Sequence, residues 1–411
     1  MPCPAAARRS HRADRRHGTI LPVTSTPVAR PDEVRRHNRT TLLRLLHVGG
    51  PCTRAALATE LGLNRSTIKT LVDSLAEAGV VEERVPRPGR GAGRPSLLVL
   101  PQPQAAVVLA VDVQVEHVAI ALVGLGGQIL GRNSWNLRGR SSEPDEVITH
   151  VIESAGMLAA DLDVKAVGVG VSVPGVVRRS DGLVHQAPNL RWTDVALGER
   201  LRSVLRIPVL VGNDAELGAV AEHLRGVAKG ASDAVYISAD VGVGGGVIAD
   251  GSSLRGATGY VGEIGHMVVN PQGRDCYCGS RGCWETEVGE AGLRRALGLP
   301  EVTPRGAVIV ELRELGRDPA AAMERLGEFA EWLTLGLVNV VNLLGPQLVI
   351  LGELFTALPE VVIDHVTEQV HRRSMVSRAV GGTRIATSAL GADVKLLGAA
   401  EVAFEGVLDT V

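Results

Sequence analysis

Long apolar stretches and cysteines are both scarce in this sequence of 411 residues. The longest apolar run, from Trp332 to Gly345, is shorter than the about 20 residues of a membrane-spanning helix, and it contains two asparagines. The first 30 residues lack the apolar segment of a secretory signal. We therefore expect a cytoplasmic protein without a membrane partner, in which the apolar run is a buried helix. The five cysteines are then expected to be thiols or metal ligands rather than disulfides.

The formal net charge of −2 conceals an uneven distribution. Residues 1–100 hold 17 basic and 8 acidic side chains, whereas residues 101–411 hold 26 and 37. A basic front end on an acidic body indicates that only the front end meets a polyanion. Residues 1–30 are rich in arginine, proline and alanine without apolar periodicity, which predicts a disordered basic tail. An incorrectly assigned start and a DNA-contacting arm are the alternatives for this segment.

Residues 31–100 have the pattern of a small helical domain closed by a hairpin. We expect helices at 39–48, 54–61 and 64–78, strands at 80–85 and 97–100, and a loop at 86–96. Thr53 and Asn64 stand where they can cap the second and third helices. The loop has the composition of a wing, so the segment predicts a winged helix-turn-helix DNA-binding domain.

The third helix of this domain carries polar and basic groups suited to base edges and phosphates of double-stranded DNA. These side chains are Asn64, Arg65, Ser66, Thr67, Lys69 and Thr70. The loop is basic and free of acids, and its Arg90 and Arg94 suit a narrow minor groove. A solvated basic surface is the alternative interpretation.

From residue 101 onward strands and helices alternate, which is typical of an α/β fold. A strand-turn-strand unit at 107–123 recurs at 234–250, and Asp112 and Asp240 stand at the ends of the two first strands. Further strands are expected at 129–137, 166–171, 209–211 and 348–351, and helices at 144–160, 195–205, 320–344, 359–372 and 394–405. The repeat predicts two similar lobes with a ligand cleft between them.

One histidine and three cysteines lie within 18 residues: His266, Cys276, Cys278 and Cys283. This set fits a closed tetrahedral zinc site, in which no position remains for water, so we expect one structural zinc ion per chain. Four unrelated buried residues are the alternative interpretation.

The segment Gly259–Glu285 around these residues resembles the signature of the ROK family, which joins repressors, uncharacterised reading frames and sugar kinases. The resemblance extends over about residues 31–411. It implies a two-lobed actin-like ATPase fold of the duplicated, ribonuclease H-like type behind the winged helix-turn-helix. We place the first lobe at 101–213 with 395–411, and the second, zinc-bearing lobe at 214–394.

The same resemblance implies roles for individual residues. His266 and the three cysteines look like the zinc ligands, with His266 also touching sugar. Glu263 and Glu285 look like ligands of sugar hydroxyls, as does the pair Asn213 and Asp214. Asp214 stands at the position of the base in the kinases. Carboxylates from separate segments supply the convergent acceptors that a sugar needs, which supports a sugar site independently.

The nucleotide motifs depart from the family pattern, so we expect no enzymatic activity and assign no catalytic residue. Asp112–Glu116 lacks both glycines of the Asp-x-Gly-Gly-Thr phosphate loop, and Glu116 replaces its hydroxyl. The second phosphate loop keeps Gly242 and the glycines at 244–246, but Val241 replaces threonine. Glu353 takes the second place of the glycine pair on the adenosine side.

The sequence therefore predicts a sugar-responsive transcriptional repressor of carbohydrate-metabolism genes. We expect a homodimer or homotetramer that binds an inverted-repeat operator. A bifunctional sugar kinase and a DNA-binding protein whose second part serves only for oligomerisation are the alternatives.

Overall fold

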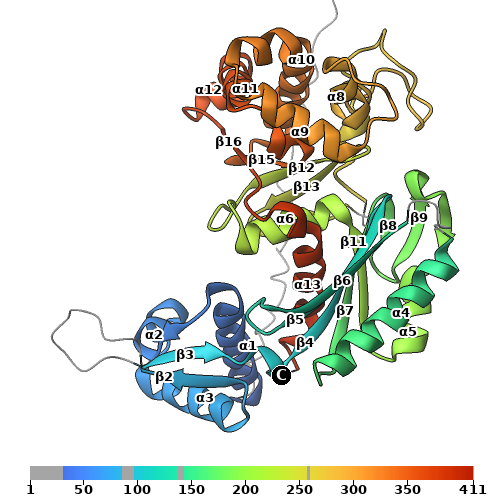
Figure 1. Ribbon diagram of the computed structural model, residues 1–411. Helices are drawn as coiled ribbons and strands as arrows, with labels where there is room; N and C mark the ends of the chain where they lie inside the picture. The colour runs from blue at the N-terminus through green and yellow to red at the C-terminus, as the bar shows by residue number, and fades with distance from the viewer. Residues whose placement is uncertain (1–30, 86–96, 138–142, 257–259, 411) are drawn as a thin grey trace, which may run out of the picture.

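The computed structural model describes residues 31–85, 97–137, 143–256 and 260–410. A small N-terminal unit packs beneath a body made of two α/β lobes, with two helices running between them (Figure 1). The proposed tail, the wing with Arg90 and Arg94, and Gly259 lie outside the described residues.

The N-terminal unit is the predicted helix-turn-helix. Its helices are α1 (Pro31–Gly49), α2 (Arg54–Leu61) and α3 (Arg65–Glu77). Its three strands β1 (Cys52–Thr53), β2 (Val81–Arg84) and β3 (Leu98–Pro101) form an antiparallel sheet in the order β1-β3-β2. Buried leucine, isoleucine and valine side chains of the helices and the sheet form one core.

Local signals fix the ends of the second and third helices. The Thr53 hydroxyl accepts a hydrogen bond from the Ala56 amide at 3.2 Å, and Asn64 Oδ1 accepts one from the Thr67 amide at 2.8 Å. Both predicted N-caps are thus confirmed. The first helix begins at Pro31, eight residues before the predicted start, because Asp32 and Glu33 favour the positive end of the helix dipole although the turn lacks apolar periodicity.

The first lobe is built on a five-stranded sheet. Its strands are β4 (Val107–Val113), β5 (His117–Gly124), β6 (Ile129–Asn136), β7 (Ala166–Val173) and β11 (Val209–Asn213), in the order β11-β7-β4-β5-β6. The first three strands form an antiparallel meander, and β7 and β11 continue the sheet in parallel.

The second lobe repeats this arrangement strand for strand. Its strands are β12 (Ala234–Ala239), β13 (Val243–Ala249), β14 (Ser252–Ser253), β15 (Leu348–Glu353) and β16 (Arg384–Thr387), in the order β14-β13-β12-β15-β16. Here too an antiparallel meander is extended by two parallel strands. The predicted duplication of an α/β unit is therefore confirmed at the level of topology.

Helices cover the sheets. In the first lobe α4 (Pro144–Asp161) packs on β5 and β6, and α5 (Leu197–Leu205) packs on β11. The second lobe carries α7 (Trp284–Val288), α8 (Glu290–Ala296), α9 (Arg305–Leu315), α10 (Pro319–Leu344), α11 (Glu360–Arg373) and α12 (Met375–Ala379). The predicted buried helix lies in α10, whose Leu333, Leu337 and Val341 are fully buried. No helix among the described residues has the length and apolar character needed to cross a bilayer.

The sequence analysis missed a small sheet between β7 and α5. Strands β8 (Val176–Arg178), β9 (Leu183–Ala187) and β10 (Trp192–Val195) pair antiparallel. The helix expected from residue 195 therefore begins only at Leu197, because Val195 pairs with Val184 in the sheet. Strands of three to five residues are too short for a clear alternating pattern.

Two helices form the centre of the body: α6 (Asp214–Arg225), which we had not predicted, and α13 (Val394–Val407). Helix α13 packs on β4 and β7 of the first lobe, whereas α6 packs on β12 and β13 of the second lobe and on α13 (Figure 1). Their backbones approach closely at Gly398, where a Cβ atom would lie 2.0 Å from the Leu217 carbonyl oxygen. Glycine is thus required at this crossing.

Candidate ligand cleft, metal cluster and DNA-facing helix

The polar side chains of α3 lie on the surface of the N-terminal unit. Arg65, Ser66, Lys69 and Thr70 are exposed, whereas Thr67 is half-buried. Lys69 Nζ lies 2.6 Å from Asp73 of the same helix. Arg65 forms no ion pair with any residue that the structure describes.

Asn64 has a different role from its neighbours on α3. Its side-chain oxygen accepts from the Thr67 amide and, at 2.7 Å, from the Ser66 hydroxyl. This oxygen starts the helix, so Asn64 positions the residues that face outward. Arg65 is then the basic group on α3 whose charge is least engaged within the protein.

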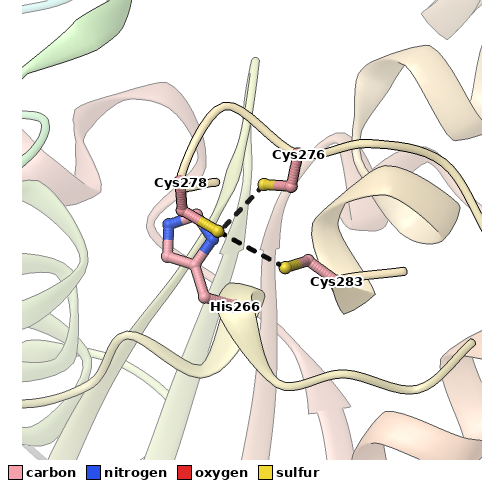
Figure 2. Close-up of side chains that lie close together, drawn as sticks. All are labelled: His266, Cys276, Cys278 and Cys283. Atoms are coloured by element: carbon pink, nitrogen blue, oxygen red, sulfur yellow. Dashed lines mark hydrogen bonds between the residues drawn. The ribbon is translucent and has the colours of Figure 1, made fainter. Parts of the chain in front are cut away.

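Four predicted metal ligands converge in the second lobe (Figure 2). The ligand atoms of His266, Cys276, Cys278 and Cys283 all lie within 4.8 Å of one another. Cys278 Sγ is 3.6 Å from Cys283 Sγ, and Cys276 Sγ is 3.6 Å from His266 Nδ1. The cluster is able to hold a metal ion.

These separations suit a tetrahedral ion of the size of zinc. Zinc–sulfur bonds of about 2.3 Å and zinc–nitrogen bonds of about 2.0–2.1 Å place two sulfurs about 3.8 Å apart, and a sulfur and a nitrogen about 3.6 Å apart. Turns hold the ligands in place. Gly279 and Gly282 have φ of +89° and +71°, and the Cys276 amide donates to the Ser280 carbonyl at 2.8 Å.

The five predicted sugar-binding residues line one cavity between the lobes. They come from the β11–α6 junction, from the segment before the cluster, and from the start of α7: Asn213, Asp214, Glu263, His266 and Glu285. Gln114, Asn189 and Tyr277 line the same cavity and were not predicted. Tyr277 lies between two predicted metal ligands and Gln114 lies in the altered phosphate loop, so both had a signal in the sequence. No pattern marks Asn189, because its segment meets the others only in the folded chain.

The predicted residues differ in how far the protein itself engages them. Asn213 caps α6, since its side-chain oxygen accepts from the Ala215 and Glu216 amides and its amide donates to the Gly175 carbonyl. The Glu263 side chain, by contrast, is 51% exposed, and its Oε2 lies 3.9 Å from His266 Nε2. Glu263 is therefore the acceptor most available to a ligand.

Glu285 and His266 complete the wall on the cluster side. Glu285 Oε2 accepts from the Val243 amide at 2.9 Å, and burial raises the pKa of its carboxyl. The His266 ring turns Nδ1 toward Cys276, whereas Nε2 lies 3.1 Å from the Tyr277 hydroxyl. A metal on Nδ1 would leave the proton on Nε2, so the ring would present a donor to the cavity.

A buried lysine contacts two residues of the cavity wall, Asp214 and Asp240. Lys395, near the start of α13, is 1% exposed. Three carboxylates surround its ammonium nitrogen: Asp214 at 2.9 Å, Asp240 at 3.0 Å and Glu353 at 3.4 Å. Burial opposes the charge, but these acidic neighbours raise the pKa of Lys395 well above its usual range. The lysine is therefore protonated.

Neither of the two segments that matched phosphate loops forms an open glycine loop. In the first turn Gln114 donates to Asp112 Oδ2 at 2.5 Å. In the second, Gly244, Gly245 and Gly246 lie within β13 rather than in a loop. A Cβ atom at Gly246 would lie 2.3 Å from the Ala215 carbonyl oxygen, so this glycine serves the packing of α6 on the sheet.

The end of α6 and the middle of α13 meet the N-terminal unit. Arg225 Nε lies 2.5 Å from Glu401 Oε1, and His47 Nε2 of α1 lies 3.2 Å from Glu401 Oε2. The Gly126 amide donates to His47 Nδ1 at 2.9 Å. His47 and Glu401 are buried, so this group of side chains fastens α1 to the first lobe.

Comparison with known proteins adds a family and three related molecules. The model of the ROK family matches residues 108–405. The chain is 29% identical over 380 residues to the xylose repressor of Bacillus spizizenii, and the match covers 92% of this chain and 97% of the repressor.

Two solved structures share the fold. A ROK family transcriptional regulator, described as a homologue of Escherichia coli Mlc, matches with a TM-score of 0.73 at 23% identity, over 92% of this chain and 97% of that chain. A ROK family glucokinase from Streptomyces griseus, solved with glucose and AMPPNP, matches with a TM-score of 0.62 at 26% identity. This second match covers 73% of this chain and 100% of the glucokinase.

Proposed function

The chain belongs to the ROK family, and from this membership we propose that it is a sugar-responsive transcriptional repressor that no longer phosphorylates its sugar. The observation that carries the proposal is the extent of the matches. The xylose repressor matches 92% of the chain, whereas the glucokinase matches 73%. The repressor match is too long to leave out the DNA-binding unit, whereas the glucokinase match is not.

The DNA-binding half of the proposal rests on α3. We propose that its outward groups enter the major groove of an operator, with Arg65 and Lys69 on bases or phosphates. The Lys69 side chain is 70% exposed, so its ion pair with Asp73 is weak enough to open when a phosphate competes. Arg90 and Arg94 are proposed to enter the adjoining minor groove.

The sensing half rests on the cavity wall beside the metal cluster. We propose that a neutral hexose or a related sugar binds there. Glu263, Glu285 and Asp214 are the proposed acceptors for its hydroxyls, and His266 is the proposed donor. Asn213 contributes by fixing the start of α6. The glucokinase is described with bound glucose, which supports a sugar as the ligand class.

The metal is proposed to be one structural zinc ion per chain. Three thiolates and one imidazole fill a tetrahedral shell, so no site remains for a reacting water. The ion would fix the His266 ring beside the sugar, and it would join the segment before the cluster to α7. Metal and sugar sites would thus form one rigid wall.

Loss of kinase activity is proposed from the state of the phosphate side. The first turn carries Gln114 and Val115 where backbone amides would have to approach a phosphate. Glu353 adds a negative charge, and its backbone has φ of +55°, a region that favours glycine. Each departure weakens nucleotide binding, while the sugar acceptors remain.

Helices α6 and α13 offer a route from the sugar to the DNA-binding unit. Helix α6 starts at Asp214 in the cavity and ends at Arg225, and its 12 residues span about 18 Å. Helix α13 carries Lys395 at the cavity and Glu401 beside His47 of α1. Sugar-dependent movement of the lobes would therefore shift the surface on which the DNA-binding unit packs.

We further propose a homodimer or homotetramer on an inverted-repeat operator, because two-fold symmetric repressors bind two-fold symmetric sites. The domain limits given for the tail, the winged unit and the two lobes remain predictions.

The test is a thermal-shift screen of neutral monosaccharides, including D-xylose and D-glucose, and their phosphates. One neutral sugar at 100 times its dissociation constant should stabilise the protein by about 2.7 kcal/mol. ATP consumption is measured in the same samples, with no sugar-dependent turnover expected. If no sugar binds, the body is an oligomerisation module, and if ATP is consumed with sugar, the chain is a kinase.

A further inference from the structure

One buried charge behind the cavity belongs to neither the sugar wall nor the metal cluster. Lys395 lies on α13, which packs on the first lobe, but its ammonium contacts carboxylates of the second lobe. Asp240 follows β12, and Glu353 ends β15. The lysine therefore bridges the two lobes at the point where their strand-turn units meet.

A second cation supports this arrangement from the other side. Arg305, at the start of α9, pairs with Asp240 and lies 3.4 Å from Glu290. Its side chain is 18% exposed, so it too is largely removed from water. The acidic groups behind the cavity are thus compensated by cations of the chain itself.

We propose that Lys395 is an internal counter-cation that holds Asp214 in place for the sugar and occupies the space a divalent cation and a bound phosphate would need. Oxygen atoms of three carboxylates converge on the ammonium, and such oxygens are also the preferred ligands of Mg²⁺ and Mn²⁺. With the lysine present, the carboxylates are engaged and a divalent cation would meet a positive charge.

The proposal deepens the proposed function, since it treats the cleft as the site of a neutral sugar. Lys395 and Asp214 lie 2.9 Å apart, so the lysine sets the position of a carboxylate that faces the cavity. Without the ammonium, Asp214 would stand beside two like charges and turn away. Lys395 is accordingly a positioning residue rather than a sugar contact.

The experiment measures Mn²⁺ binding to zinc-loaded protein without sugar or DNA, and electron paramagnetic resonance detects the bound ion. Mn²⁺ is chosen because carboxylates favour it and thiolates favour zinc. Lys395→Ala should bind one Mn²⁺ ion per chain more than about tenfold tighter than wild type, whose cleft should stay free of Mn²⁺ at the concentration that fills the variant. Lys395→Arg keeps the charge and should bind none.

Stability provides a second measurement if Lys395→Ala folds poorly. Removing one partner of a buried ion pair should lower the melting temperature by about 10 °C, and millimolar Mn²⁺ should restore part of that loss in Lys395→Ala but not in Lys395→Arg. The double variant Lys395→Met/Glu353→Gln should melt higher than Lys395→Met alone. Equal melting of all variants, or Mn²⁺ binding by wild type as tight as by Lys395→Ala, overturns the proposal.

These outcomes separate the inference from the proposed function. If wild type binds neither sugar nor operator but Lys395→Ala gains Mn²⁺, the counter-cation proposal is supported and the repressor proposal is excluded. If wild type binds sugar but Lys395→Ala gains no Mn²⁺, the repressor proposal is supported and the counter-cation proposal is excluded.

Discussion

Two ion pairs join helices α6 and α13, a cleft pair and a far pair, and the two differ in what surrounds them. In the cleft pair, Lys395 contacts Asp214 beside an open cavity. In the far pair, Arg225 contacts Glu401 under the DNA-binding unit, where His47 covers the carboxylate. The same two helices thus have one pair on the predicted sugar cavity and one pair in contact with a side chain of the DNA-binding unit.

This difference indicates separate roles for the two ion pairs, one in ligand binding and one in its transmission to DNA. Asp214 of the cleft pair can exchange its partners for a ligand, because it lines the predicted sugar cavity. Glu401 of the far pair contacts His47 of α1, so a movement there would pass directly to the DNA-binding unit. Variants at the two pairs should therefore separate ligand binding from its transmission to DNA.

The largest effect is expected when a ligand of the metal cluster beside the cavity is removed. Cys283→Ser should release zinc and unfold the segment between His266 and α7, because apparent zinc-binding free energies are about 10–16 kcal/mol in small metal-dependent domains. Elemental analysis and calorimetry measure both losses. Cys52→Ser, in the DNA-binding unit, is the matched control and should keep its zinc. Retention of zinc by Cys283→Ser would contradict the assignment.

A smaller loss is expected at the far pair. Glu401→Gln removes the carboxylate partner of Arg225 and should cost about 3–5 kcal/mol of unfolding free energy at pH 7. Burial opposes the charge of Glu401, but His47 and Arg225 hold the pKa of this carboxyl below its usual range. Its contribution is thus present above the unfolded pKa of about 4.3 and is lost as the pH falls through the lower folded value. Denaturant unfolding should show the two proteins converging in acid, and a pH-independent difference would be inconsistent with this pair.

Glu263→Ala tests the cavity beside the cleft pair alone. Loss of a charged acceptor should weaken sugar binding by about 1.5–3 kcal/mol, or roughly tenfold to 150-fold, while operator binding without sugar is unchanged. Titration calorimetry measures the first and gel shift the second. Glu301→Ala, an exposed glutamate of the second lobe, should behave as wild type. A Glu263→Ala variant with normal sugar affinity would remove Glu263 from the site.

Arg65→Ala tests the exposed surface of the DNA-binding unit, which lies beyond the far pair. It should weaken operator binding by about 1–3 kcal/mol, and if the contact is to a phosphate the slope of log affinity against log salt should fall by about one. The matched control is Arg313→Ala, an exposed arginine on α9 far along the chain from the DNA-binding unit. Equal affinities for the two variants would exclude Arg65 from the interface.

Local signals in the sequence predicted what depends on neighbours along the chain. The caps at Thr53 and Asn64, the metal cluster and the repeated strand-turn unit are of this kind. Lys395 is of the other kind, because nothing near residue 395 indicates that Asp214 and Glu353 will surround it. The contact between Glu401 and His47 spans 354 residues and was likewise invisible. Such contacts between distant segments are set by packing, which periodicity does not encode.

Sugar binding and operator binding by the same protein test the central claim most directly. Fluorescence anisotropy of labelled operator DNA is measured with and without saturating sugar, and sugar affinity with and without operator. We predict that each ligand changes the affinity of the other by the same factor, about 5–150-fold, without ATP. Operator affinity that stays constant while the sugar site fills would contradict the account.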